Sequence, residues 1–235
     1  MENMLEVNNI HTYIGQYHIL QGVSFTAKEG EVTVLIGRNG AGKTTTLRSI
    51  MGLNPPSVGT IRFKGREIHY LETHQIAGLG IGYVPEDQGL FHGLTVEENL
   101  KIAMEKNDPR TDERLETVLR LFPDLKQFWK KEAGLLSGGQ KQMLSIARSY
   151  MNNNELLLID EPSKGLAPIV VEKVMAFIEN LKKETTIILV EQNFIVASTV
   201  GDCFYMIDDG KTVASGLMTD LIKDEEMKRK YLGIA

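Results

Sequence analysis

The glycine-rich run that follows the first apolar segment constrains this fold more than any other feature of the chain. Residues 32–36 are mostly apolar, and they lead directly into the run Gly37-Arg38-Asn39-Gly40-Ala41-Gly42-Lys43-Thr44-Thr45. Residues 44–51 then place apolar side chains at helical spacing. A strand, a glycine loop and a helix in this order form a P-loop, which binds the phosphates of a nucleoside triphosphate. The alternative is a tight connection without a ligand, but the flanking strand and helix favour the P-loop.

Each residue type in this run has a chemical role. The glycines let backbone N–H groups turn toward the phosphates, and Lys43 places a positive charge beside the transferring phosphoryl group. Thr44 offers a hydroxyl oxygen to magnesium. We therefore expect a nucleoside triphosphate and Mg²⁺ to bind at residues 37–45.

Length and composition exclude several classes of protein. The chain has 235 residues, which suits one α/β domain or a domain with an inserted subdomain. Its formal net charge of −5 argues against a nucleic-acid surface, which needs clustered Lys and Arg. Cys203 has no second cysteine to pair with, and the N-terminus lacks the pattern of a secretion signal. We expect a cytosolic protein that reaches a membrane through a partner, because no apolar window approaches the roughly 18 to 20 residues that cross a bilayer.

Two kinds of strand pattern are present. Residues 4–10, 19–27 and 59–63 are short segments with glycines around them, which predicts an antiparallel β portion. Residues 156–159 and 186–190 are apolar on both faces, as in the central strands of a parallel sheet. The predicted fold class is α/β, with a P-loop NTPase core, a mainly parallel sheet and an N-terminal antiparallel β portion.

Residues 95–151 have a helical pattern instead. Apolar residues recur at i, i+3, i+4 and i+7 from Leu115 and again from Met143. This predicts a helical subdomain, approximately residues 90–151, inserted into a single domain that spans residues 1–235. Near the end of the chain, Asp209-Gly210 predicts a tight hairpin, and residues 218–232 predict one charged helix.

Two carboxylates follow the apolar segment 156–159. Asp160 and Glu161 would therefore lie at the carboxyl end of a buried strand, where such sheets bind ligands. Asp160 is suited to hold Mg²⁺, and Glu161 can accept a proton from the water that attacks the γ-phosphate. An acidic surface turn is the alternative for such a pair alone, but the P-loop in the same chain favours the catalytic interpretation.

A second glycine motif lies before the helix predicted at residues 141–151. In Leu136-Ser137-Gly138-Gly139-Gln140, Ser137 and Gln140 have the spacing of a capping box, which is a structural role. Capping does not need two adjacent glycines, which lose backbone entropy unless something approaches the main chain closely. The bare N–H groups and the serine hydroxyl also suit a second phosphate site.

The order of these three motifs resembles the nucleotide-binding subunit of ATP-binding cassette (ABC) transporters, and the resemblance covers the whole chain. In that family two cassettes pack head to tail, so that the P-loop of one and the LSGGQ signature of the other enclose each ATP. The resemblance implies ATP and Mg²⁺ as ligands and a dimer during catalysis. It assigns ATP contacts to residues 37–45 and to Ser137, Gly138, Gly139 and Gln140, and metal contacts to Thr44 and Asp160.

Two positions depart from the family pattern. Glu86 stands where the family usually has a glutamine, and Gln192 stands where it has a histidine. Gln192 can donate a hydrogen bond to the γ-phosphate but cannot relay a proton. Glu86 brings negative charge toward the phosphates, so we expect it to contact the water shell of the metal or the attacking water. With the segments VPEDQGLF, EPSKGLAP and VEQN and the terminal YLG, the chain resembles LivF-type ATPases of branched-chain amino acid importers.

Two further contacts are expected from aromatic residues. The family usually places an aromatic residue directly before a glycine near the first strands, where it stacks on adenine. Here Ile14 precedes Gly15, and either Tyr13 or Tyr17 could stack on adenine. We favour Tyr13, and plain packing is the alternative for both tyrosines. Leu125, Phe128 and Trp129, together with Phe91, either pack in the core or line a groove for a helix of a membrane subunit.

We expect an ATP-hydrolysing subunit of an ABC importer, in which Glu161, Lys43 and Gln192 act in catalysis and branched-chain amino acids are the cargo. Importers of urea, short amides or other amino acids, a lipid exporter and a soluble ABC ATPase are the alternatives. The resemblance implies two transmembrane permease subunits, a second cassette that is a copy of this chain or a related one, and indirectly an extracytoplasmic solute-binding protein. The chain would lie at the cytoplasmic face of the membrane.

Overall fold

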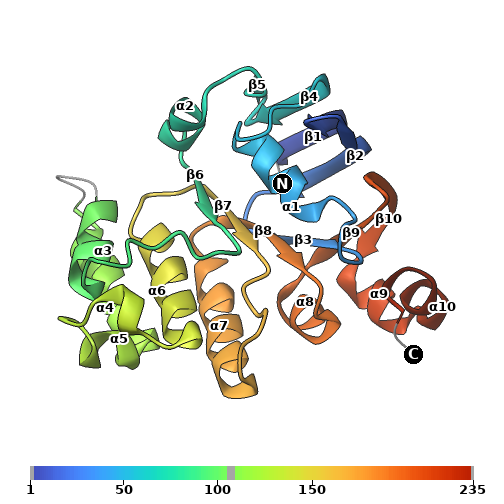
Figure 1. Ribbon diagram of the computed structural model, residues 1–235. Helices are drawn as coiled ribbons and strands as arrows, with labels where there is room; N and C mark the ends of the chain where they lie inside the picture. The colour runs from blue at the N-terminus through green and yellow to red at the C-terminus, as the bar shows by residue number, and fades with distance from the viewer. Residues whose placement is uncertain (1–2, 105–108, 234–235) are drawn as a thin grey trace.

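The computed structural model describes residues 3–104 and 109–233 and contains two β-sheets with helices around them (Figure 1). The strands are β1 Asn3–Ile14, β2 Tyr17–Lys28, β3 Val32–Ile36, β4 Val58–Phe63, β5 Arg66–Glu67, β6 Ile81–Val84, β7 Leu156–Asp160, β8 Thr186–Glu191, β9 Cys203–Asp208 and β10 Lys211–Leu217. The helices are α1 Lys43–Ile50, α2 Thr73–Gly78, α3 Val96–Ala103, α4 Thr111–Leu121, α5 Pro123–Gln127, α6 Gly138–Tyr150, α7 Pro168–Leu181, α8 Phe194–Val200, α9 Met218–Lys223 and α10 Glu225–Met227.

The larger sheet has the strand order β10-β9-β3-β8-β7-β6 and is mainly parallel, as predicted. Strands β9, β3, β8, β7 and β6 run parallel to one another, and only β10 pairs antiparallel, through the hairpin at Asp209-Gly210. All residues of β3, β7 and β8 are buried, which explains their apolar sequences. The parallel order brings the carboxyl ends of β3, β6, β7 and β8 to one edge of the sheet.

The smaller sheet is antiparallel and has the order β2-β1-β4-β5. Its three longer strands correspond to the predicted segments near residues 4–10, 19–27 and 59–63. Its side chains Leu5, Val7 and Ile10 are fully buried, and a register shift separates Val7 from Ile10. They share a hydrophobic cluster with Leu47 of α1 and Leu158 of β7, so this sheet packs over α1 and one face of the parallel sheet.

Helices cover the opposite face of the parallel sheet. Figure 1 shows α3 to α6, in green and yellow, together at one end of the molecule beside α7. They share a second hydrophobic cluster with α7, in which the rings of Phe122 and Phe177 stack at 4.5 Å between centroids. Within the helical stretch predicted at residues 95–151, positions 105–108 lie outside the described residues.

The prediction of one charged helix over residues 218–232 is wrong. The segment divides into α9, α10 and a π-helical turn, Lys228–Leu232. Asp224 leaves the helical conformation at ψ 87°, and its side chain accepts a hydrogen bond from the N–H of Met227. The side chain of an Asp can bond to the backbone at the start of a new helix, which competes with continuation of the preceding helix. This capping bond at Asp224 explains why α9 ends at Lys223.

Candidate functional site

The glycine loop connects β3 to α1 at the carboxyl edge of the parallel sheet. Lys43 begins α1 and folds back over the loop, where its Nζ donates hydrogen bonds to the carbonyl oxygens of Gly37 at 2.9 Å and Arg38 at 3.0 Å. A Cβ on Gly37 would lie 2.1 Å from the carbonyl oxygen of Ile207, so no larger residue fits there. Gly42 adopts φ 104°, which also requires glycine. Gly37 therefore allows the loop to lie close to the backbone of Ile207, and Gly42 allows the loop to turn into α1.

Both predicted carboxylates lie beside the loop. Thr44 Oγ1 donates a hydrogen bond of 3.1 Å to Asp160 Oδ1, and Tyr83 donates one of 3.3 Å to Asp160 Oδ2. Burial raises the pKa of Asp160 to about 6, although the hydrogen bond from Thr44 acts in the other direction. The metal-binding pair expected from the sequence is therefore assembled from α1 and β7.

Glu161 is held close to Lys43. Its Oε1 atom lies 3.6 Å from Lys43 Nζ, and both side chains are buried. Burial lowers the pKa of Lys43, and the charge of Glu161 opposes this effect. Glu161 has φ 45°, a conformation that non-glycine residues rarely adopt and that often occurs at functional sites. The predicted lysine and catalytic carboxylate thus form a close pair.

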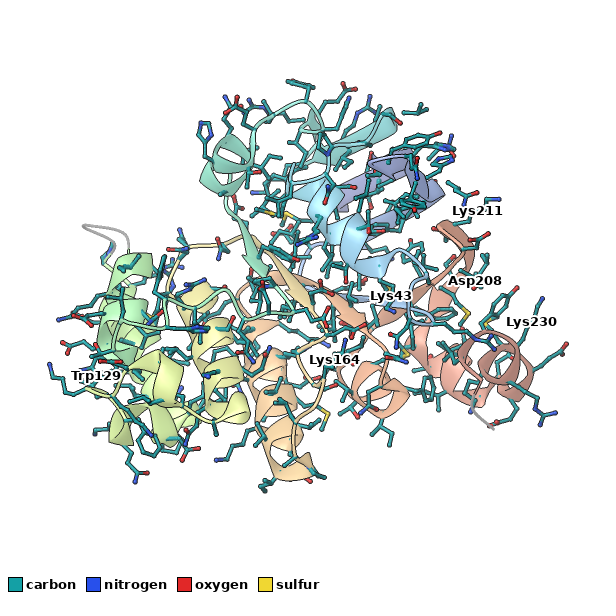
Figure 2. The ribbon with its side chains drawn as sticks, in the orientation of Figure 1. Lys43, Trp129, Lys164, Asp208, Lys211 and Lys230 are labelled. Carbon is teal, nitrogen blue, oxygen red and sulfur yellow. The ribbon has the colours of Figure 1, made fainter. Side chains whose placement is uncertain are left out.

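An open cavity of about 430 Å³ lies over these residues. Figure 2 shows Lys43 and Lys164 near each other in the middle of the molecule, and both line this cavity. The other lining residues come from the loop, α1, β2 and the segments after β6 and β7: Ile19, Asn39, Gly40, Gly42, Thr44, Thr45, Glu86 and Glu161. The loop and the predicted acidic residues Glu86 and Glu161 therefore share one cavity.

Glu86 has a positive neighbour that the sequence reasoning did not identify. Lys164 Nζ lies 2.5 Å from Glu86 Oε1 and 3.5 Å from Glu161 Oε2. The hydrogen bond with Glu86 raises the pKa of Lys164, so its ammonium is charged at neutral pH. The sequence carried one hint, because a carboxylate at position 86 needs a compensating charge among phosphates.

Glu191 is a second residue whose role sequence reasoning missed. It ends β8, is fully buried and accepts hydrogen bonds of 3.1 Å from the N–H groups of Ser163, Gln192 and Asn193. Burial raises the pKa of Glu191, while these bonds favour its charged form. One carboxylate thus connects the turn after Glu161 to the loop that carries Gln192. Gln192 itself is exposed to solvent.

The LSGGQ segment forms the start of α6. Gln140 N–H donates to Ser137 Oγ at 3.3 Å, and the side chain of Gln140 accepts from the N–H of Ser137 at 3.0 Å, which is the predicted capping box. Ser137 and Gly138 are exposed. None of the residues 137–140 lines the cavity at Lys43. Within one chain, therefore, the structure does not bring the two predicted phosphate sites together.

The predicted adenine contact lies outside the cavity. Tyr13 is 50% exposed and stacks in parallel on His18, with ring centroids 4.2 Å apart. Tyr17 is more exposed, and neither tyrosine lines the cavity. One face of Tyr13 is thus covered by His18, and its role toward adenine stays a prediction.

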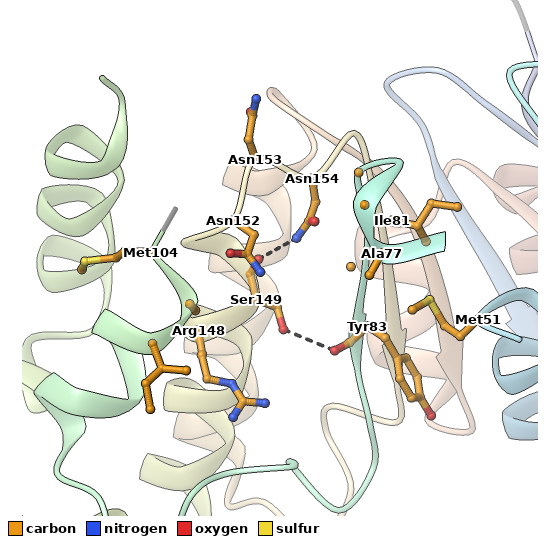
Figure 3. Close-up of a pocket in the computed structure, with 15 residues that line it drawn as sticks. Met51, Ala77, Ile81, Tyr83, Met104, Arg148, Ser149, Asn152, Asn153 and Asn154 are labelled. Atoms are coloured by element: carbon orange, nitrogen blue, oxygen red, sulfur yellow. Dashed lines mark hydrogen bonds between the residues drawn. The ribbon is translucent and has the colours of Figure 1, made fainter. Parts of the chain in front are cut away.

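Of the four residues expected in the core or in a groove, three lie in the core or pack against it. Leu125 is fully buried, and Phe128 and Trp129 pack against the core. Phe91 is half exposed, and the guanidinium of Arg148 lies 5.4 Å from its ring centroid. Arg148 extends from α6 into a hollow of about 550 Å³ between α6 and β6 (Figure 3). None of Phe91, Leu125, Phe128 and Trp129 lines this hollow.

The chain is similar to known proteins over most of its length. Residues 20–164 match the model of the family described as ABC transporter. The chain belongs to the ABC transporter family. A high-affinity branched-chain amino acid transport ATP-binding protein, BraG of Pseudomonas aeruginosa, is 39% identical, and the alignment covers 98% of this chain and all of BraG. A LivF protein of Archaeoglobus fulgidus, named as a probable branched-chain amino acid transport ATP-binding protein, is 36% identical over 98% of this chain and 99% of its own length.

Other members of the ABC family are more distant or share mainly the fold. The lipopolysaccharide export ATP-binding protein LptB of Escherichia coli is 31% identical over 99% of this chain and 98% of its own. The solved structure of a dimeric ATP-binding cassette in a post-hydrolysis state, bound to ADP and Pi, has a TM-score of 0.81 and 26% identity, covering 92% of this chain and 99% of that one. In our chain, none of the helices described over residues 3–104 and 109–233 is long and apolar enough to cross a membrane.

Proposed function

We propose that this chain hydrolyses ATP to drive an ABC importer for branched-chain amino acids. The observation that carries the proposal is that Lys43, Thr44 and Glu161 line one cavity, where Thr44 is hydrogen-bonded to Asp160. The cargo rests on the similarity to the BraG and LivF proteins, whose names state branched-chain amino acid transport. Similarity to LptB, an export protein, is lower, which favours import over lipid export.

In the proposed mechanism, the loop N–H groups and Lys43 bind the phosphates and stabilise the negative charge that develops on the γ-phosphoryl oxygens. Lys43 is already directed toward the loop by its bonds to Gly37 and Arg38. Glu161 accepts the proton of the attacking water, and its position 3.6 Å from Lys43, the proposed phosphate ligand, supports this role. Gln192 donates an amide hydrogen bond to the same phosphate from the loop that Glu191 anchors.

The residues present suit Mg²⁺. A hydroxyl and a carboxylate, Thr44 Oγ1 and Asp160 Oδ1, lie 3.1 Å apart, and Mg²⁺ prefers hard oxygen ligands of this kind. We propose that these two residues hold the ion, which neutralises phosphate charge when it is bound. Glu86 lines the same cavity as Thr44, and from there it would contact the water shell of the ion.

A second cassette completes each ATP site in this proposal. Ser137, Gly138, Gly139 and Gln140 of one cassette face the phosphates bound at residues 37–45 of the other. The exposure of Ser137 and Gly138 and their absence from the chain's own cavity support this arrangement, as does the similar dimeric cassette. The partner cassette is a copy of this chain or a related subunit. Tyr13 stacks on adenine through the ring face that His18 leaves open.

We further propose that residues 90–151 form a helical subdomain and that the hollow beside it, at the cytoplasmic face of the membrane, receives a helix of a permease subunit. The hollow lies between α6 and β6 (Figure 3). In the sequence, Glu86 is the second residue after β6. A permease helix bound there would be displaced if Glu86 and the segment after β6 move when nucleotide binds. Two permease subunits would dock in this way, and a solute-binding protein would act on their outer side.

The test of the proposed function is the Glu161→Gln variant. We expect hydrolysis to fall by about 100-fold or more, because a positioned general base contributes a factor of this size. ATP-dependent dimers should persist, since the amide keeps the shape of the side chain. The exposed Glu172 of α7 supplies a matched control, Glu172→Gln, which should hydrolyse ATP as the parent does. Hydrolysis by Glu161→Gln at the parental rate would remove Glu161 from this role.

A further inference from the structure

Lys164 connects two segments of the site that come from different strands. It lies in the turn after β7, where the N–H of Lys164 donates to the carbonyl of Glu161 at 3.2 Å. Its ammonium lies 2.5 Å from Glu86, which follows β6, and 3.5 Å from Glu161. One side chain therefore contacts the two acidic residues that line the cavity.

The charges of the cavity explain why this contact matters. Glu86, Asp160 and Glu161 bring three carboxylates to the region that receives the phosphates. Lys43 balances one of them, and it is already bonded to the glycine loop. Among residues 3–104 and 109–233, Lys164 is the cation found within ion-pair distance of Glu86. Without it, Glu86 would present an uncompensated negative charge to an anionic nucleotide.

Fold stability does not account for this pair. The side chains of Lys164 and Glu86 are 54% and 43% exposed, and exposed ion pairs contribute little to stability because water screens them. A nucleotide in the cavity would displace part of this water and strengthen the interaction between the remaining charges. The effect of the pair should therefore appear in nucleotide binding and turnover.

We propose that Lys164 is a positioning residue for ATP hydrolysis, which neutralises Glu86 and holds the carboxylate of Glu161 toward the γ-phosphate. Lys164 bonds to the acidic residues and does not itself take part in the reaction. This inference rests on the proposed role of Glu161 as the general base.

Nucleotide binding without metal tests the charge compensation. A fluorescent ATP analogue is titrated in EDTA into the parent chain, Lys164→Met, Glu86→Gln and the double variant. Lys164→Met should weaken binding by about 3- to 10-fold, because one negative charge is then unpaired near the phosphates. The double variant should bind within about twofold of the parent, since both charges are gone. Equal weakening in Lys164→Met and the double variant would overturn the proposal.

Steady-state hydrolysis with Mg²⁺ tests the positioning. We expect Lys164→Met to lower kcat by about fivefold or more with a smaller change in KM, because the group that it orients acts in the transition state. Lys164→Arg should recover most of the activity, since a guanidinium also pairs with two carboxylates. Lys173→Met is the control, because Lys173 pairs with Asp124 of α5 at 2.9 Å and does not line the cavity. A parental kcat in Lys164→Met would contradict the proposal, whereas parental hydrolysis by Glu161→Gln would contradict the proposed function itself.

Discussion

Substitution of Glu191 would test whether this one buried carboxylate stabilises two loops of the site. Its oxygens accept three backbone hydrogen bonds, one from Ser163 and two from Gln192 and Asn193. The change Glu191→Gln keeps the size of the side chain but replaces one acceptor oxygen by an NH₂ group. This NH₂ group would then face N–H donors, so at least one of these bonds must break.

The expected loss of stability follows from which donors can find water instead. Gln192 and Asn193 are exposed, so their N–H groups can bond to solvent, whereas Ser163 is buried. A hydrogen bond to a charged group contributes about 1.5 to 3 kcal/mol. Removal of a buried charge offsets part of the loss, because burial raises the pKa of Glu191. We expect a net decrease of about 2 kcal/mol in the free energy of unfolding, which lowers Tm by about 4–8 °C for a chain of this size.

Thermal unfolding monitored by circular dichroism measures this shift, and ATP hydrolysis is assayed on the same samples below the transition. Hydrolysis should fall together with Tm, because the loops that carry Lys164 and Gln192 lose their common anchor. Glu172→Gln removes an exposed carboxylate from α7 and serves as the control, with an expected Tm within about 1 °C of the parent. If Glu191→Gln unfolds at the parental temperature and hydrolyses ATP at the parental rate, the carboxylate does not support these loops.

Two other substitutions distinguish the contribution of the glycine loop to nucleotide binding from the contribution of the helical core to stability. Gly37→Ala places a Cβ 2.1 Å from the carbonyl of Ile207, so the loop must move, and we expect nucleotide binding to be lost in a fluorescence titration. Phe177→Ala leaves a cavity beside Phe122 and should cost about 3–5 kcal/mol in a denaturant titration, while nucleotide affinity stays parental because this contact lies in the helical cluster. Retained binding in Gly37→Ala, or lost binding in a folded Phe177→Ala, would contradict this division.

The parts of the site that could be predicted are those encoded by local order. Residues 37–45 follow a buried strand, the pair Asp160-Glu161 lies at the end of another, and parallel strands bring their carboxyl ends to one edge. The contact between Thr44 and Asp160 follows from these rules, although 116 positions separate the two residues. The main features of the fold were also predictable from local order, because apolar runs indicate buried strands and a helical spacing of apolar residues indicates helices.

Contacts between side chains of different loops could not be predicted in this way. Nothing in the local sequence of Lys164 specifies that its ammonium reaches Glu86, because the turn conformation and the distance between β6 and β7 decide the contact. The same holds for Glu191, whose three donors come from two loops. The break at Asp224 was missed because its capping interaction competes locally with a helical charge pattern.

The two interpretations of Ser137, helix cap and phosphate ligand, are compatible in the structure. Its Oγ atom accepts a hydrogen bond from the N–H of Gln140, which uses a lone pair and not the hydroxyl proton. An exposed serine at a helix start can therefore cap α6 and still donate its proton to a phosphate oxygen. Residues 137–140 do not line the chain's own cavity, which supports the proposal that this phosphate belongs to the ATP of a partner cassette. In the proposed dimer the cap would also serve catalysis, because it would set the direction in which the hydroxyl of Ser137 and the first N–H groups of α6 point toward the partner's ATP.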